Sequence, residues 1–442
     1  MDVLHHGALN GVTGSCHQLL LSDSRSLLID CGLFQGDDAK GRDETKIDFP
    51  LKGIQGMIVT HIHIDHVGRI PYLLAAGFNE PIFCSPPTAK LLPLMMEDAL
   101  RVGVTRNKRL IERFLHDLRR YIRPMAYQKW HKLDGGVKMR LTPAGHVLGS
   151  SIVEIDYRGK RAVFSGDLGS RHQPLLKEAK SPERADILVL ESTYGDRNHV
   201  DRSQRVEQLE KILCHTLQDK GVTIIPAFSV GRTQELLFEM NEIFDGVGRV
   251  LGCSMLQNVD VIIDSPLAQR FTELYNDLTP YWADEARRVL TYDDQPLVFE
   301  NLVQIENHGE HRDTIEYLQK SDLPAVVIAA SGMCAGGRVV NYLKEFLGDE
   351  RTDIVFVGYQ ANGTPGRYIQ DSDWVQLDGK RYEIRAKTHQ LSGYSAHADQ
   401  SDLIRFVEGM QERPKAIRLV HGEARAKQVL RRELEKRDYH VI

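Results

Sequence analysis

The chain has 442 residues, of which 42% are hydrophobic and 26% charged, and this length predicts two domains or one domain with a large insertion. Its formal net charge of −5 argues against binding of duplex nucleic acid by bulk electrostatics, although bound cations and local basic clusters can supply a positive field where a polyanion binds. No apolar run is long enough to span a bilayer, no signal peptide is visible, and the six cysteines are scattered, so we expect reduced thiols in a cytoplasmic protein without membrane contact.

Short apolar runs alternate with helical patterns along the chain, which predicts an α/β protein. Strands are expected at 27–29, 57–59, 162–164, 187–190, 222–225, 325–328, 354–357 and 417–420. Helices are expected within 88–121, between Asp201 and Gly221, and within 235–244, 339–347 and 402–410.

The expected strand at 57–59 leads into a histidine-rich turn with the sequence HIHIDH at residues 61–66. Three imidazoles and one carboxylate without cysteine suit zinc or a similar divalent cation, and they leave coordination positions open. A solvated polar loop is the alternative interpretation, but three histidines in six positions far exceed the average density of 18 in 442 residues. The turn therefore predicts a metal site.

Five expected strands end in a residue that is capable of chemistry. These strand-end residues are Asp30, His61, Asp167, Glu191 and His421. In layered α/β proteins, ligands bind where the ends of strands converge. We therefore expect residues from distant parts of the sequence to assemble one shared site.

The order of these motifs resembles that of the metallo-β-lactamase superfamily. The matching positions are Asp30, HIHIDH at 61–66, Gly145-His146 and Gly166-Asp167. Further motifs, ESTYG at 191–195, GYSAHAD at 393–399 and VHGE at 420–423, resemble those of the β-CASP branch. This branch contains nucleic-acid-processing enzymes, including the endonuclease of the cleavage and polyadenylation machinery. The resemblance covers essentially the whole chain.

The resemblance implies a particular architecture. We expect a four-layer αββα metallo-β-lactamase domain in two parts, residues 1–196 and 385–442, and an inserted α/β β-CASP domain at residues 197–384. The resemblance places the active site in a cleft between the two domains, which would admit a single strand more readily than a duplex.

The resemblance further implies a pair of zinc ions, with manganese or iron as alternatives. Their expected ligands are His61, His63 and His146 for one ion, Asp65, His66 and His421 for the other, and Asp167 for both. Two ions about 3.5–4 Å apart bind a hydroxide and steady the attacking and leaving oxygens of a phosphoryl transfer. Asp65 is expected to contact this hydroxide, and Asp30 to orient a ligand through a hydrogen bond.

His397 is the expected general acid, because the departing alkoxide needs a proton and an imidazole titrates near neutral pH. The resemblance implies that Glu191 hydrogen-bonds His397 and fixes its tautomer. A capping role beside Asp399 is the alternative for His397. His421 favours RNA as the substrate, because members of the branch that act on RNA carry histidine in this last motif.

Three glycine-containing segments, 226–234, 331–338 and 358–367, follow expected strands and present free N–H groups that suit phosphates. The candidate substrate-binding residues are Arg232, Ser331, Gly332, Arg338 and Arg367. The alternative is that these glycines only form turns.

We therefore expect a metal-dependent ribonuclease that hydrolyses phosphodiester bonds of single-stranded RNA, with a homodimer as an open option. Hydrolysis of small esters, thioesters or cyclic nucleotides is one alternative, although such substrates do not require an inserted domain. A non-catalytic RNA-binding subunit is another alternative, but such relatives typically lose metal ligands, whereas every expected ligand is present here.

Overall fold

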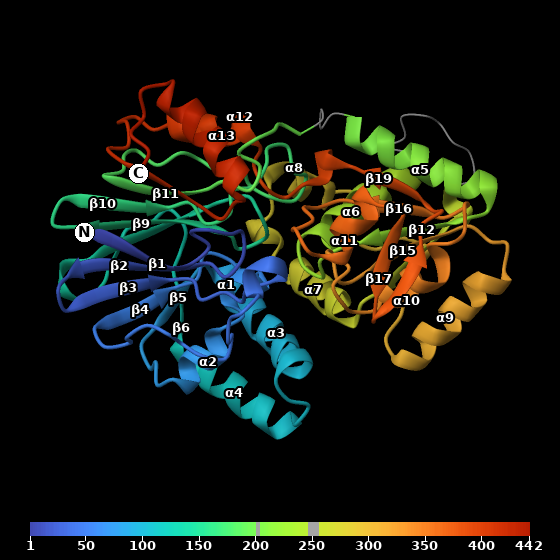
Figure 1. Cartoon of the computed structure of the whole chain (residues 1–442), viewed down its shortest axis with the longest axis horizontal. Helices are drawn as coiled ribbons and strands as arrows, with labels where there is room; N and C mark the ends of the chain where they lie inside the picture. The colour runs from blue at the N-terminus through green and yellow to red at the C-terminus, as the bar shows by residue number, and fades with distance from the viewer. Residues whose placement is uncertain (200–203, 246–255) are drawn as a thin grey trace. The chain divides into compact units, whose positions relative to one another are not determined.

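The computed structural model describes residues 1–199, 204–245 and 256–442. The chain forms two compact units (Figure 1). The first unit combines Met1–Asn198 with His397–Ile442, and the second unit is His199–Ala396. The second unit is thus an insertion within the sequence of the first.

The first unit contains two six-stranded sheets. The first sheet has the order β1 (Asp2–Gly7), β2 (Cys16–Ser22), β3 (Arg25–Ile29), β4 (Ile54–Ile58), β5 (Ile82–Cys84), β6 (Ile122–Pro124). The second sheet has the order β20 (Ile417–Val420), β11 (Ile187–Glu191), β10 (Lys160–Phe164), β9 (Ser151–Tyr157), β8 (Lys138–Pro143), β7 (His131–Lys132). Strands β3 to β6 are parallel, as are β10, β11 and β20, so within each of these sets the carboxyl ends lie at one edge of the sheet.

The two sheets pack face to face through their buried aliphatic side chains. Leu19, Ile29 and Ile58 of the first sheet belong to the same buried cluster as Val153 and Phe164 of the second. Strand residues alternate between the two faces of a sheet, so every second residue of a strand enters this cluster. The apolar runs predicted as strands thus form the core between the sheets.

Helices cover the outer faces of this pair of sheets (Figure 1). They are α1 (Ile64–Val67), α2 (Ile70–Ala75), α3 (Pro86–Gly103) and α4 (Lys108–Tyr121) beside the first sheet, and α12 (Gln400–Glu408) and α13 (Ala424–Glu435) beside the second. Leu403 of α12 and Leu430 of α13 pack against Val163 and Leu188 of the second sheet. The four-layer αββα arrangement predicted from the sequence is confirmed.

The mostly helical segment expected at 88–121 consists of two helices. Ser85 caps α3 by accepting a hydrogen bond from the backbone N–H of Thr88. Asn107 caps α4 by accepting hydrogen bonds from the N–H groups of Arg109 and Leu110. The chain therefore turns between Gly103 and Asn107, and α4 starts afresh.

The second unit contains one six-stranded sheet in which every strand pair is parallel. Its order is β14 (Leu302–Gln304), β13 (Asp260–Asp264), β15 (Ala325–Ala329), β12 (Val222–Pro226), β16 (Asp353–Phe356), β19 (Lys387–Gln390). One face packs on α5 (Arg205–Asp219) and α6 (Arg232–Phe244), and the other on α9 (His308–Lys320), α10 (Val339–Phe346) and α11 (Pro365–Asp371). The remaining elements are α7 (Pro266–Asp277), α8 (Asp284–Val289) and the hairpin of β17 (Trp374–Leu377) and β18 (Lys380–Glu383). The α/β insertion with a mostly parallel sheet agrees with the sequence.

Short 3-10 helices also occur in the described part of the chain: η1 (Gly36–Ala39), η2 (Asp134–Gly136), η4 (Leu256–Asn258), η5 (Thr279–Tyr281) and η6 (Ser392–Tyr394). The predicted domain boundary at residue 385 differs from the end of the second unit at Ala396. The reason is that β19 pairs in parallel with β16, so this stretch completes the sheet of the insertion. The helix predicted after Asp201 is observed from Arg205, and residues 200–203 lie outside the described residues.

In the described part of the chain no helix is both long and apolar enough to cross a membrane. The five cysteines within the described ranges, Cys16, Cys31, Cys84, Cys214 and Cys334, are all free thiols. The sixth, Cys253, lies outside the described residues.

Candidate metal centre and catalytic residues

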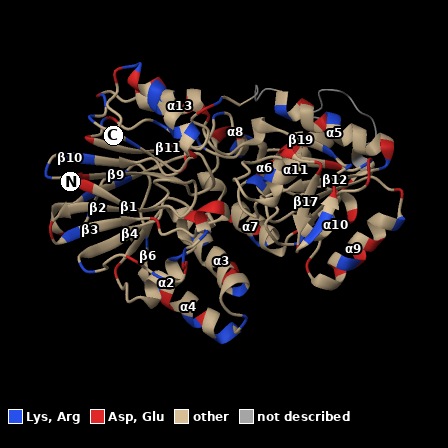
Figure 2. Ribbon diagram, viewed as in Figure 1, with Lys and Arg blue, Asp and Glu red and all other residues tan. Residues whose placement is uncertain are grey.

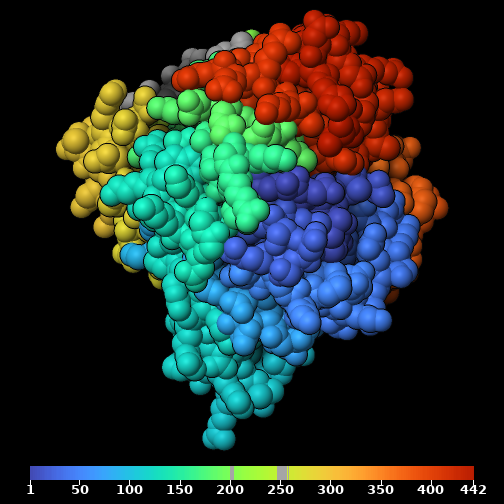
Figure 3. Space-filling model, turned by 90° about the vertical axis from the view of Figure 1, so that its left-hand side faces the viewer, coloured from blue at the N-terminus to red at the C-terminus, as the bar shows by residue number. Residues whose placement is uncertain are grey.

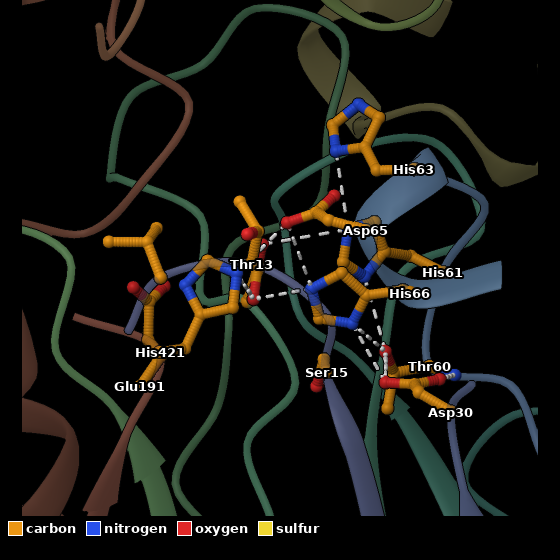
Figure 4. A network of polar contacts seen from close by, with 12 residues as sticks. Thr13, Ser15, Asp30, Thr60, His61, His63, Asp65, His66, Glu191 and His421 are labelled. Atoms are coloured by element: carbon orange, nitrogen blue, oxygen red, sulfur yellow. Dashed lines mark hydrogen bonds and ion pairs between the residues drawn. The ribbon is translucent and has the colours of Figure 1, made fainter. Parts of the chain in front are cut away.

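The ends of strands in both sheets of the first unit deliver their polar residues to one place (Figure 4). His61, His63 and His66 arrive on the segment that follows β4, and His421 approaches from the opposite side on the segment that follows β20. The other contributing residues are Asp30 after β3, Asp65 in α1, His146 between β8 and β9, Asp167 after β10, Glu191 at the end of β11 and His397 before α12. The structure thus brings together all ten residues that the sequence placed at or beside the metal site.

One group of donors consists of three imidazoles and one oxygen of Asp167. Nδ1 of His63 lies 3.2 Å from Nε2 of His61 and 3.0 Å from Nε2 of His146. Oδ2 of Asp167 lies 3.6 Å from Nε2 of both His61 and His146. A tetrahedral shell with zinc–nitrogen bonds of about 2.0–2.1 Å places neighbouring donors about 3.3 Å apart, which matches these separations.

A second group uses the other oxygen of Asp167. Oδ1 lies 3.2 Å from Nε2 of His66 and 3.5 Å from Nε2 of His421. Oδ2 of Asp65 lies 3.2 Å from Nε2 of His421 and 3.8 Å from Nε2 of His66. The two oxygens of Asp167 therefore face two different sets of donors.

The histidines of the first group are held neutral. Burial lowers the pKa of His61 and His146 well below the usual value, and His66 and His397 respectively add to this effect. Burial likewise lowers the pKa of His63 to about 4. A neutral imidazole carries the lone pair that a metal ligand needs.

The histidines of the second group have the opposite tendency. Burial disfavours the charged form of His421, but the carboxylates of Asp167 and Asp65 outweigh it and raise the pKa of His421 to about 9. Asp167, Asp65 and Asp30 raise the pKa of His66 well above its usual value in the same way. The three carboxylates thus favour positive charge at this end of the site.

The donor set fits a pair of divalent cations. Nε2 of His66 and Oδ1 of Asp167 are buried and form no hydrogen bond within the described part of the chain. Buried polar atoms without hydrogen bonds are costly, so their convergence on one point indicates a cation as their partner. Nitrogen and carboxylate donors without thiolate suit zinc, and also manganese or iron.

Asp30 holds the ring of His66 in place. Its Oδ2 lies 2.8 Å from Nδ1 of His66, and its carboxylate accepts hydrogen bonds from the backbone N–H and the hydroxyl of Thr60 at 2.8 Å and 2.7 Å. A proton on Nδ1 leaves the Nε2 lone pair of His66 for a metal, which is the usual effect of a carboxylate behind a ligating histidine.

Backbone immediately before β2 and immediately after β3 supports the histidine-rich segment. The N–H of Ser15 donates to the carbonyl of Asp65 and the N–H of Cys31 donates to the carbonyl of His66, both at 2.8 Å. A Cβ atom at Gly32 would lie 1.5 Å from the carbonyl oxygen of Asp65, so only glycine permits this approach. These close backbone contacts hold the segment that carries Asp65 and His66 in place.

His397 and Glu191 form a pair at the edge of the metal ligands. Nδ1 of His397 lies 3.3 Å from the carboxylate of Glu191 and 3.9 Å from Oδ2 of Asp167. Glu191 is buried, and it also accepts hydrogen bonds from the N–H groups of Leu168 at 2.6 Å and Thr193 at 3.3 Å. The side chain of His397 remains 14% exposed, so solvent reaches it.

The positioning role of Thr60 and Thr193 was missed in the sequence. The hydroxyl of Thr193 lies 3.1 Å from Nδ1 of His421. It therefore contacts the ring nitrogen that faces away from the metal site, just as the carboxylate of Asp30 contacts Nδ1 of His66. Thr193 belongs to the segment ESTYG at 191–195, and Thr60 directly precedes His61, so position within a motif was the available signal.

The predicted phosphate-binding residues all lie in the second unit, and its three candidate arginines pair with carboxylates there. Arg232 is buried against Glu235, Arg338 pairs with Asp264, and Arg367 pairs with Asp371. The hydroxyl of Ser331 is buried without a hydrogen bond among the described residues, and the carbonyl of Gly332 accepts a hydrogen bond from the Gln360 amide at 2.8 Å. Phosphate contacts of these residues stay predictions.

Comparisons with known proteins agree with this geometry. A model of the metallo-beta-lactamase superfamily matches residues 12–213, a Beta-Casp domain model matches residues 233–369, and a model described as a Zn-dependent metallo-hydrolase RNA specificity domain matches residues 381–442. A protein named ribonuclease TTHA0252 from Thermus thermophilus is 34% identical over 96% of this chain and 93% of its own length.

A further relative by sequence supports the family, and a solved structure supports the fold. A protein named transcription termination factor FttA from Methanocaldococcus jannaschii is 30% identical over 94% of this chain and 66% of its own length. Among solved structures, a protein of unknown function from Enterococcus faecalis V583 has a TM-score of 0.55 at 13% identity, covering 100% of this chain and 97% of that one. At this identity the solved structure supports the fold alone.

Substitution of Asp167 should remove more metal than substitution of any single histidine. We expect the Asp167→Ala protein to lose both cations, because each oxygen of Asp167 faces a different donor group. His146→Ala should lose one cation, and His440→Ala, which changes an exposed histidine of the same unit, should lose none. Elemental analysis of the purified proteins measures the metal content. Two retained ions in Asp167→Ala would contradict the shared ligand.

Substitution of Asp30 by asparagine should weaken metal binding without removing a ligand. We expect metal affinity to fall about 10- to 100-fold, as for other carboxylates behind ligating histidines, because an amide does not hold the proton on Nδ1 of His66 as a carboxylate does. Competition with a metal-sensitive chelating dye measures the affinity. An unchanged affinity would show that Asp30 supports the backbone only.

Proposed function

Because the chain belongs to the metallo-β-lactamase superfamily, in its β-CASP branch, we propose that it is a metal-dependent ribonuclease that hydrolyses phosphodiester bonds of single-stranded RNA. The observation that carries the proposal is the pair of donor groups that share Asp167. The match to an RNA specificity domain and the relative named as a ribonuclease support RNA as the substrate. Relatives of these names do not favour a small-molecule hydrolase.

We infer that the two groups hold two zinc ions, with manganese or iron as alternatives. The metallo-hydrolase model that matches residues 381–442 is described as zinc-dependent, which supports zinc. A pair of divalent cations supplies Lewis acidity, which acidifies water and offsets negative charge on phosphoryl oxygens. The histidines of the first group, neutral because of burial, can bind without first losing a proton.

Asp65 and His397 are the proposed catalytic residues that act on substrate. Their side chains remain 17% and 14% exposed, whereas His61, His66 and Asp167 are nearly fully buried. Asp65 would accept a hydrogen bond from the attacking water. His397, with Nδ1 held by Glu191, would give the proton on Nε2 to the departing oxygen. Glu191 is a positioning residue, because it acts through His397.

Cleavage of labelled RNA tests the function. We expect metal-loaded protein to cut single-stranded RNA of about 20 nucleotides, and a chelator to abolish the cutting until metal is restored. Asp65→Ala should be inactive, and His397→Ala should lose about 10²- to 10⁴-fold in kcat with its metal content unchanged, because only the proton donor is removed. His440→Ala serves as the control. RNA blocked at both ends distinguishes internal cutting from cutting at an end.

A metal-loaded protein that leaves every single-stranded RNA intact would contradict the ribonuclease proposal. Full activity of Asp65→Ala would contradict the site assignment. A panel of small esters, assayed beside RNA, identifies the alternative activity in the first case. The cytoplasmic location and the homodimer stay predictions of the sequence.

Glu191 should act on the rate only through His397. We expect Glu191→Gln to lower kcat, because the amide still accepts a hydrogen bond but holds Nδ1 of His397 less firmly. The double variant Glu191→Gln, His397→Ala should then be no slower than His397→Ala alone. Additive losses in this double-mutant cycle would show that Glu191 has an independent role. KM should change little in either variant.

A further inference from the structure

One face of helix α4 carries a row of three arginines and one histidine. Arg109, Arg113, His116 and Arg120 are spaced by 4, 3 and 4 residues, so they share one side of the helix, and all four are exposed. We call these four residues the basic stripe. The opposite side of the helix is buried through Ile111, Leu115 and Leu118. Packing therefore fixes the direction in which the stripe faces, which is toward solvent.

The charge around the basic stripe is opposite to that of the whole chain. Residues 101–123 contain eight Lys and Arg against two Asp and Glu, a net charge of +6 in a chain of net charge −5. All eight cationic side chains are exposed. Figure 2 shows Lys and Arg gathered along α4 and near its junction with α3. A region this basic in an acidic protein is a local attraction for polyanions.

The arginines of the basic stripe are not neutralised by neighbouring carboxylates. Arg101 forms an ion pair with Glu97 at 2.6 Å, but within the described part of the chain no ion pair involves Arg109, Arg113 or Arg120. This differs from the arginines of the second unit that were predicted to bind phosphate, which all pair with carboxylates. The N–H groups of these guanidinium groups are thus available to donate hydrogen bonds to an external anion.

The basic stripe lies outside the metal centre but in the same unit. The hydroxyls of Ser85 and Thr88, at the start of α3, donate to the carbonyl of Gly149 at 2.7 Å and 2.9 Å, so α3 begins beside the loop that carries His146. Its 18 residues then extend about 27 Å to the turn that precedes α4. Figure 3 shows this segment projecting below the rest of its unit. Only an RNA longer than the part bound at the metals can reach it.

We propose that the basic stripe binds the phosphate backbone of RNA beyond the cleavage site, an inference that rests on the proposed ribonuclease function. Arg109 and Arg120 are 11 residues apart, which is about 16 Å along the helix and spans several phosphates of a nucleic-acid strand. Arginine forks onto phosphate oxygens irrespective of the base. The stripe therefore adds affinity for long RNA without sequence preference.

The test removes the stripe's charge while leaving the metal centre intact. The triple variant Arg109→Gln, Arg113→Gln, Arg120→Gln is compared with Lys132→Gln, Lys138→Gln, Lys160→Gln, which removes the same charge from exposed positions on β7, β8 and β10. Binding of RNA of about 30 nucleotides is measured over a range of salt concentrations in a His397→Ala background with chelator-free buffer and short incubation, because this variant is expected to cleave about 10²- to 10⁴-fold more slowly. Cleavage of RNA of about six nucleotides is measured with His397 intact.

We expect the arginine variant to bind the long RNA roughly tenfold more weakly than its parent. The slope of log affinity against log salt concentration should fall in magnitude by about 2, because each of the three lost phosphate contacts on a single strand contributes about 0.7. The lysine variant should bind as its parent does, and both should cleave the short RNA at the parental rate. Equal affinity and slope in the arginine variant, or an equal loss in the lysine variant, would overturn the proposal. The exposed Val102, Val104 and Leu110 would then indicate a protein partner for this helix.

The two proposals fail in different ways. If the parent protein cleaves no RNA of any length, the ribonuclease proposal fails. The binding curves still decide whether the basic stripe holds phosphate, because they require no turnover.

Discussion

The carboxylate of Asp167 is buried between two sets of imidazoles, and the rest of the centre depends on where its two oxygens point. Burial of an unpaired carboxylate costs several kcal/mol, so the surrounding groups must supply positive charge. Burial alone would raise the pKa of Asp167, but His421 and His66 outweigh it and hold the pKa well below the usual value. Divalent cations can supply that charge, and so can protons on His66 and His421, whose pKa values the carboxylates raise.

This arrangement requires unusual backbone at the strand ends. Asp30 and His421 adopt the left-handed conformation with φ of 59° and 50°, and Gly166 precedes Asp167 with φ of 55°. Such conformations cost about 1–3 kcal/mol for residues other than glycine, although Asp and His are among the residues that adopt them more often. The N–H of Asp30 donates to the carbonyl of Ile58 at 2.9 Å, and that of His421 to the carbonyl of Ala8 at 2.7 Å. These backbone bonds stabilise the sharp turns that bring the side chains to the site.

The sequence predicted most of the site because the relevant signals are local. An apolar run followed by Asp, Glu or His locates a strand end, and the order of the motifs supplies the family. Pairings between distant residues carry no such signal. β19 reads as a short polar segment, and only its alignment with β16 assigns it to the insertion. Arg338 follows a glycine-rich turn as a phosphate-binding arginine does, but Asp264, which is 74 residues earlier in the sequence, pairs with its charge.

The charge balance of the centre explains why attraction for RNA would have to come from elsewhere. Its four carboxylates, Asp30, Asp65, Asp167 and Glu191, are matched in number by the four positive charges of two divalent cations. A loaded centre therefore carries little net charge beyond the proton that His397 is proposed to give. Such a centre orients one phosphate well but exerts little long-range pull on a polyanion, since long-range attraction depends on net charge and is screened within about 10 Å at 0.1 M salt. In a chain of net charge −5, the exposed arginines of α4 supply a positive field of the kind that the centre lacks.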